Sequence, residues 1–225
     1  MDVKSNWFML SIVGILLIIV IILGVLYTGQ QTDVVSMQNE VDALTDDVSN
    51  LTSQLVVSEA LKTESEDFIS AYFSGWGIYY AAVDIEDTAW SNYDKADGYY
   101  DVGNWYSAVG YFAEASTFFM NARTKYQDAF DLFRDAANIT GDTVWMNISQ
   151  QCISMMDNKM KAMVFVREAS ELMGDTCDAY LDGKYDTAHD YYDEAQTKYG
   201  YYQDQMNVFD DYQASFALIL LEYVS

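Results

Sequence analysis

The chain has 225 residues, of which 51% are hydrophobic and 16% aromatic, so it is too rich in large apolar groups to be disordered. It contains no proline, which is typical of long uninterrupted helices. Its 35 acidic and 11 basic residues give a formal net charge of −24, which disfavours binding to nucleic acids. Aspartate-rich, lysine-poor surfaces are found in salt-adapted prokaryotes, although solubility alone would also account for this one.

Residues 7–27 form an uncharged apolar run that is long enough to cross a hydrocarbon core of about 30 Å. Trp7 and Tyr27 stand at its two ends, where interfacial aromatic residues belong. The run is longer than the core of a signal peptide and lacks a small-residue cleavage site, so we predict an uncleaved signal anchor. Lys4 is the basic residue that flanks it, which places residues 1–6 in the cytoplasm and the remainder outside the cell membrane.

Residues 28–62 carry a heptad pattern with no glycine or proline after Gln30. Apolar side chains alternate in steps of three and four, with valine at the a position and leucine mostly at d, a choice that favours two-stranded coiled coils. This seam consists of Val34, Met37, Val41, Leu44, Val48, Leu51 and Leu55. We predict a coiled-coil stalk that joins a homo-oligomer; the alternative is that the seam packs against the chain's own bundle.

Residues 63–225 show helical periodicity in four stretches, and short glycine-containing connections make neighbouring helices antiparallel. The expected helices are 64–101, 105–138, 144–182 and 185–223. In the second, large and small residues alternate in a row that is typical of a packed core: Trp105, Phe112, Phe119, Tyr126 and Phe133, with Ala108, Ala115, Ala122, Ala129 and Ala136. Comparable rows run from Ile69 to Tyr100, from Trp145 to Val166 and from Tyr185 to Leu220.

The predicted fold class is therefore all-α: a transmembrane helix, a coiled-coil stalk and a long antiparallel four-helix bundle. The bundle would form an ectodomain, residues 63–225, built from two helical hairpins, 64–138 and 144–223.

An internal duplication supports the two hairpins. Gly103 begins GNWYSAVGYFAEA and Gly183 begins GKYDTAHDYYDEA, so glycine, aromatic, alanine and glutamate positions coincide at an offset of 80 residues. The segment around Gly183 resembles the turn of a tetratricopeptide repeat, although the period of that family is about 34 residues. The resemblance is local. It implies hairpin turns at both glycines and the binding of a peptide in a groove.

Three N-x-S/T sequons make Asn50, Asn138 and Asn147 candidates for glycosylation, the latter two in an expected loop around Gly141.

Cys152 and Cys177 lie 25 residues apart on one expected helix. At 1.5 Å per residue that separation is about 37 Å, too far for a disulfide unless Gly174 breaks the helix, so we expect two packed thiols.

The search for catalytic chemistry finds few candidates. His189 is the single histidine and has no cysteine or histidine at ligand spacing, so we expect it to be solvated. Glu86 and Asp97 fall on the aromatic row of the first bundle helix; they are either buried at considerable cost or solvated at its edge. We expect no catalytic, metal or cofactor site, and therefore not an enzyme.

These features predict a structural or interaction protein of the cell envelope. It would be held in membrane lipid and would self-assemble or scaffold other envelope proteins, without nucleic acid as a partner. One alternative is a sensor-like or solute-binding ectodomain that works with a separate partner. Another is a pilin-like filament subunit, although no prepilin-type cleavage pattern precedes the apolar run.

Overall fold

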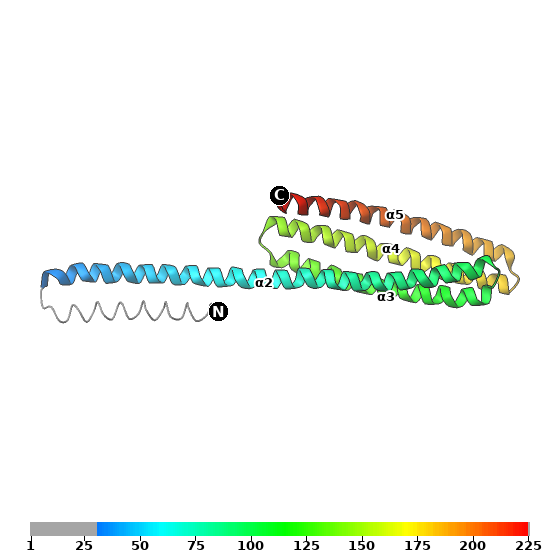
Figure 1. Ribbon diagram of the computed structural model, residues 1–225, viewed down its shortest axis with the longest axis horizontal. Helices are drawn as coiled ribbons and strands as arrows, with labels where there is room; N and C mark the ends of the chain where they lie inside the picture. Colours follow the sequence, from blue (N-terminus) through cyan, green and yellow to red (C-terminus); the bar gives the residue numbers. More distant parts are fainter. Residues whose placement is uncertain (1–30, 225) are drawn as a thin grey trace. The chain divides into compact units, whose positions relative to one another are not determined.

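The computed structural model describes the backbone of residues 31–224 and side chains from residue 38 to 221, and this part of the chain contains helices and no strands. The helices are α2 (Gln31–Asp101), α3 (Trp105–Ile139), α4 (Thr143–Leu181) and α5 (Tyr185–Val224), shown in Figure 1. The expected membrane span, residues 7–27, lies outside the described residues. Within residues 31–224, no helix combines the length and the apolarity that crossing a bilayer requires.

The chain divides into two packing units, residues 1–62 and residues 63–225. In the second unit, aromatic contacts show that α2 and α3 are antiparallel, because Trp76 meets Phe133 near the end of α3 and Tyr93 meets Phe112 near its start. Helix α5 is also antiparallel to α2, because Trp76 contacts Phe216 and Trp90 contacts Tyr202. Since α4 packs against both α3 and α5, the predicted helical bundle is confirmed.

The core follows the predicted row of α3. Its members Phe112, Phe119, Tyr126 and Phe133, together with the five alanines, are fully buried, whereas Trp105 at the end of the row is half-buried. The predicted rows of α2 and α5 were wrong at their first residues. Ile69 is 49% exposed because Phe68 turns inward instead, and Tyr185 is 59% exposed because it is the first residue of α5, beyond the last packed layer.

The two duplicated glycines end helices in the same way, with φ of +72° at both Gly103 and Gly183. The Gly103 amide donates to the carbonyl of Tyr100 (2.9 Å), and the next amide, of Asn104, donates to the carbonyl of Tyr99 (2.9 Å). Equivalent bonds surround Gly183, where the amide of Lys184 reaches the carbonyl five residues back. This is the Schellman cap, which favours glycine because its φ is left-handed, and it confirms the two predicted turns.

A third glycine is required by close packing instead. A Cβ atom at Gly75 would lie 2.9 Å from a ring carbon of Phe133, so the small residue lets α2 approach the largest side chain at that level of α3.

The connection between α3 and α4 is shorter than the sequence suggested. Asp142 caps α4 by accepting from the amides of Val144 (2.8 Å) and Trp145 (3.2 Å), and the Gly141 amide donates to Glu64 Oε1 of α2 (2.9 Å). Asn138 and Asn147 consequently lie in α3 and α4, and the expectation that they occupy a loop was wrong.

Gly174 lies inside α4, and both cysteines of that helix are free and buried, as expected.

Candidate functional site

The predicted oligomer seam lies on α2, where its side chains are unevenly covered. Those of Val34 and Met37 are outside the described ones; Val41, Leu44 and Leu55 are half-buried, whereas Val48 is 46% and Leu51 63% exposed. An apolar a/d row with this much exposure offers a contact surface for another helix.

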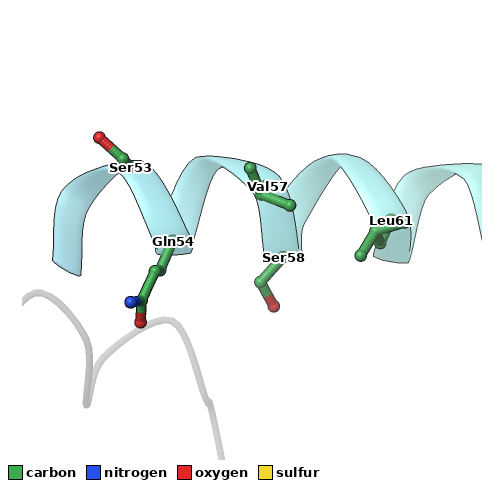
Figure 2. Close-up of a pocket in the computed structure, with 5 residues that line it drawn as sticks. All are labelled: Ser53, Gln54, Val57, Ser58 and Leu61. Atoms are coloured by element: carbon green, nitrogen blue, oxygen red, sulfur yellow. The ribbon is translucent and has the colours of Figure 1, made fainter. Parts of the chain in front are cut away.

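Next to the seam, α2 has a shallow surface hollow lined by Ser53, Gln54, Val57, Ser58 and Leu61 (Figure 2). Val57 and Leu61 are 58% and 60% exposed, and none of the five side chains is charged. Hydroxyl and amide groups without an adjacent acid or base are poor catalysts, so this hollow provides contact surface rather than reactive chemistry.

The three sequon asparagines are all exposed: Asn50 on α2, Asn138 on the last turn of α3 and Asn147 near the start of α4. In the third sequon the asparagine, Asn147, is exposed, whereas the hydroxyl residue, Ser149, is fully buried. The Ser149 Oγ has no hydrogen-bond partner within the described structure. Glycosylation at any of the three sites stays a prediction.

A layer of charge crosses the middle of the bundle core, and each helix contributes one residue to it. Glu86 of α2 is only 5% exposed. Lys159 of α4 donates to both of its carboxylate oxygens, at 3.0 and 2.9 Å, and the Tyr126 hydroxyl of α3 donates to Glu86 Oε2. Phe209 of α5 completes the layer, with its ring centroid 5.0 Å from Lys159 Nζ, a cation–π contact.

The surroundings of this charge layer hold its hydroxyl groups in the protonated form. Burial raises the pKa of Tyr126 well above its ordinary value, and the Glu86 carboxylate raises it further by charge and by accepting the hydroxyl proton. Burial, followed by the charge of Glu86, raises the pKa of Tyr79 to about 12. Both oxygens of Glu86 are engaged, so the group is a neutralised internal ion pair and is poorly placed to take a proton from a substrate.

Glu86 is buried, which is one of the two alternatives that its place on the aromatic row left open, whereas its partner was not among the residues predicted from the sequence. Lys159 stands seven residues after Cys152 and seven before Val166, on the inward row of α4. Counting polar as well as apolar residues along the heptad would have found it, because a lysine in such a row requires a buried counter-charge.

The other polar candidates are solvated. Asp97 is exposed, and its pKa is raised mainly by partial burial, then by the neighbouring charges of Asp101 and Asp94. His189 is exposed too, with its ring 6.2 Å from that of Tyr180 in an edge-on contact. Neither side chain belongs to the charge layer.

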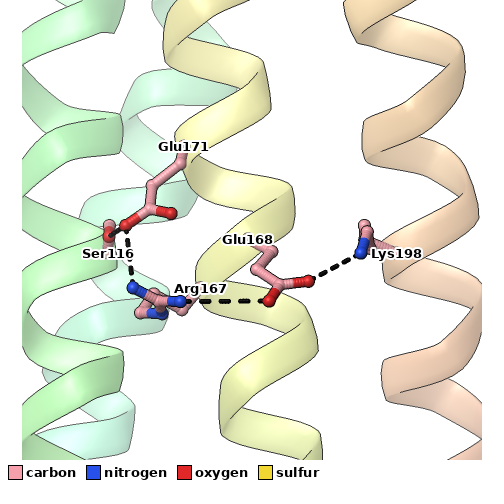
Figure 3. A network of polar contacts seen from close by, with 5 residues as sticks. All are labelled: Ser116, Arg167, Glu168, Glu171 and Lys198. Carbon is pink, nitrogen blue, oxygen red and sulfur yellow. Dashed lines mark hydrogen bonds and ion pairs between the residues drawn. The ribbon is translucent and has the colours of Figure 1, made fainter.

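A second polar network ties α3, α4 and α5 together nearer the surface (Figure 3). The Ser116 hydroxyl donates to Glu171 (2.9 Å), which also accepts from Arg167 (3.2 Å). On the other side of α4, Lys198 of α5 donates to Glu168 (2.7 Å). Ser116 is buried, but the charged side chains are 28–49% exposed, so each ion pair contributes only modestly and the network is an interhelical tie.

Comparison with protein-family models, with curated proteins and with solved structures gives no match to this chain. Functional inference therefore rests on its own residues.

Proposed function

We propose that this chain is a membrane-anchored structural and interaction protein of the cell envelope, rather than an enzyme. In this proposal residues 7–27 hold it in the membrane, residues 28–62 form a stalk, and the acidic bundle of residues 63–225 lies on the non-cytoplasmic side. Its copies associate through the seam of the stalk.

One observation carries the proposal: a regular a/d row on α2 leaves large apolar side chains in solvent. Leu51 is 63% exposed, and burying such a side chain contributes about 1.5–3 kcal/mol. Val48 is exposed as well, and Val41, Leu44 and Leu55 continue the row half-buried, a spacing that supports a two-stranded coiled coil because each side chain would enter a hole formed by four residues of the facing helix.

The test is the mass of the full-length chain in mild detergent, measured by size-exclusion chromatography with light scattering. We expect a dimer for the natural sequence. Replacing Leu44 and Leu51 together by aspartate should give a monomer, because two like charges per helix would be forced into the seam.

A matched control introduces the same two charges away from the seam and the hollow, as Ala43→Asp and Ser49→Asp at exposed outward positions of α2. This control should remain dimeric. A natural chain that is monomeric, or a control that dissociates as readily as the seam variant, would contradict the proposal. Long polymers would favour the filament subunit instead.

The orientation has its own test. Protease added to intact cells should digest the bundle while leaving a membrane-embedded N-terminal fragment, because Lys4 predicts a cytoplasmic N-terminus. Full protection of the bundle in cells with an accessible surface would reverse the proposed orientation.

A further inference from the structure

The two glycine turns lie at the same end of the bundle and are joined by one aromatic side chain. Tyr180, just before the second turn, stacks on Trp105 just after the first, with ring centroids 4.8 Å apart. Its ring also contacts Tyr100 at 6.2 Å and Tyr185 at 6.0 Å. The segments 99–106 and 180–190, far apart in the sequence, thus form one surface, which we call the turn surface.

Large apolar side chains stand in solvent on this turn surface. The exposed fractions are 83% for Tyr106, 77% for Val102, 59% for Tyr185, 49% for Leu181 and 36% for Tyr99. Such a concentration at the end of a bundle differs from singly scattered apolar residues and marks an interaction site. Tyrosines are favoured at such sites because they supply a large contact area with few rotatable bonds.

The charge of the turn surface is one-sided. Residues 99–106 and 180–190 hold four aspartates against one lysine and one histidine. The single lysine, Lys184, is already paired with Asp182 at 2.8 Å. An aromatic surface bordered by carboxylates complements a cation, because both the ring face and the carboxylate attract positive charge.

The same recognition already occurs once within the chain, at the same end of the bundle. Lys95 Nζ lies 5.8 Å from the ring centroid of Tyr111, and that ring is stacked on Tyr99 at 5.5 Å. A lysine of the protein itself therefore occupies one tyrosine face here, whereas Tyr106 and Tyr185 present most of their surface to solvent.

We propose that the turn surface is a docking site for a basic polypeptide segment, whose arginine or lysine side chains lie over Tyr106 and Tyr185 beside the surrounding aspartates. This inference deepens the proposed function by naming the chemistry of a partner that the scaffold holds. It involves residues of the bundle alone and does not depend on association through the stalk seam.

The test uses the full-length chain in mild detergent and a labelled peptide of alternating arginine and glycine, with binding followed by fluorescence anisotropy. Salt of about 0.15 M limits diffuse attraction to a screening length of about 8 Å. Replacing both Tyr106 and Tyr185 by alanine should weaken binding about tenfold, the effect expected of two lost cation–π contacts. The matched control, Tyr80→Ala with Tyr201→Ala, removes two exposed tyrosines elsewhere and should change the affinity less than about twofold.

A second pair of variants distinguishes the contribution of the aromatic ring from that of apolar surface area. Because one of the two should bind and the other should not, the pair also shows that weak binding is not caused by misfolding. Leucine at positions 106 and 185 keeps the apolar contact but removes the ring, so binding should stay weak, whereas tryptophan should restore it. Equal losses in the turn-surface and control variants, absence of peptide binding, or binding of a neutral oligosaccharide in place of the peptide would each overturn the inference. Light scattering on the same samples reports the oligomeric state, so failure of the docking site and failure of the stalk seam are told apart.

Discussion

Two stretches of α2 follow the same heptad rule and end in different environments. Leu51 in the predicted seam is 63% exposed, whereas Tyr79, on the equivalent row within the bundle, is 9% exposed and packs against Tyr126 of α3. Hydrophobic periodicity specifies which face of a helix is apolar, but not which molecule covers that face. A row that is covered by the same chain stabilises the folded monomer. A row that is covered only by a second chain stabilises the oligomer, and that stabilisation depends on protein concentration.

The largest expected contrast compares two phenylalanines. Phe119→Ala should lower the free energy of unfolding by about 3–5 kcal/mol, because it empties a fully buried site. Phe73→Ala, at a position that is 66% exposed, should change it by less than about 1 kcal/mol. Urea unfolding of the full chain, followed by circular dichroism, measures both. Equal effects of the two changes would show that the core assignment is wrong.

The second-largest expected effect on the free energy of unfolding concerns the charge layer. Lys159→Met strands the Glu86 carboxylate in the core and should cost about 3 kcal/mol. Adding Glu86→Gln to that variant removes the uncompensated charge and should recover much of the loss. The double-mutant cycle, again by urea unfolding, would contradict the pairing if the two substitutions were simply additive.

Alkaline pH should weaken the bundle and spare the stalk. Burial raises the pKa of Cys152 to about 12 and that of Tyr79 to about 12, whereas in the unfolded chain these groups ionise at about 8.5 and 10. The raised values stabilise the folded state fully below pH of about 8.5 for Cys152 and about 10 for Tyr79, and this contribution is lost as the pH rises towards 12, by about 1.4 kcal/mol per group and pH unit.

Residues 31–61 contain neither tyrosine nor cysteine, so association through the seam should not share this alkaline transition. Thermal unfolding and light scattering across the same pH series would separate the two. A midpoint that stays constant up to pH of about 11 would contradict the buried, protonated state of these side chains.

The smallest expected effect belongs to the seam. Leu51→Ala should leave the unfolding free energy of the bundle within about 0.5 kcal/mol of the natural value, because the side chain is exposed there. The same change should weaken self-association. A loss of bundle stability as large as that of Phe119→Ala would show that the seam packs against its own bundle.

Much of the fold was predictable because its pattern repeats. Helices α3, α4 and α5 begin and end within one residue of the positions expected from the sequence. Five heptads of alternating large and small residues leave few ways to pack, and Gly103 and Gly183 occupy backbone conformations that other residues avoid. Row ends were less predictable: Phe68 takes the inward place expected for Ile69, and Tyr185 lies beyond the last packed layer.

The charge layer was only half predictable. Glu86 was visible as an acid on an aromatic row, but Lys159 was missed because only the apolar members of the α4 row were counted. The turn surface was partly predictable, because antiparallel alternation of the four expected helices places the Gly103 and Gly183 turns at the same end of the bundle. The contacts of Tyr180 with Tyr100 and Trp105, which join the two turns, appear only when the helices are assembled.

The Glu86–Lys159 pair also disfavours homodimers of either hairpin. Residues 64–138 and 144–223 share their turn geometry and part of their sequence, so a symmetric bundle of two copies of either hairpin is the alternative that the native bundle has to outcompete. A homodimer of the first hairpin would bury carboxylates without an ammonium group, and one of the second would bury ammonium groups without a carboxylate. The buried acid on one hairpin and the buried base on the other therefore favour the pairing of the two different hairpins over the pairing of two identical ones.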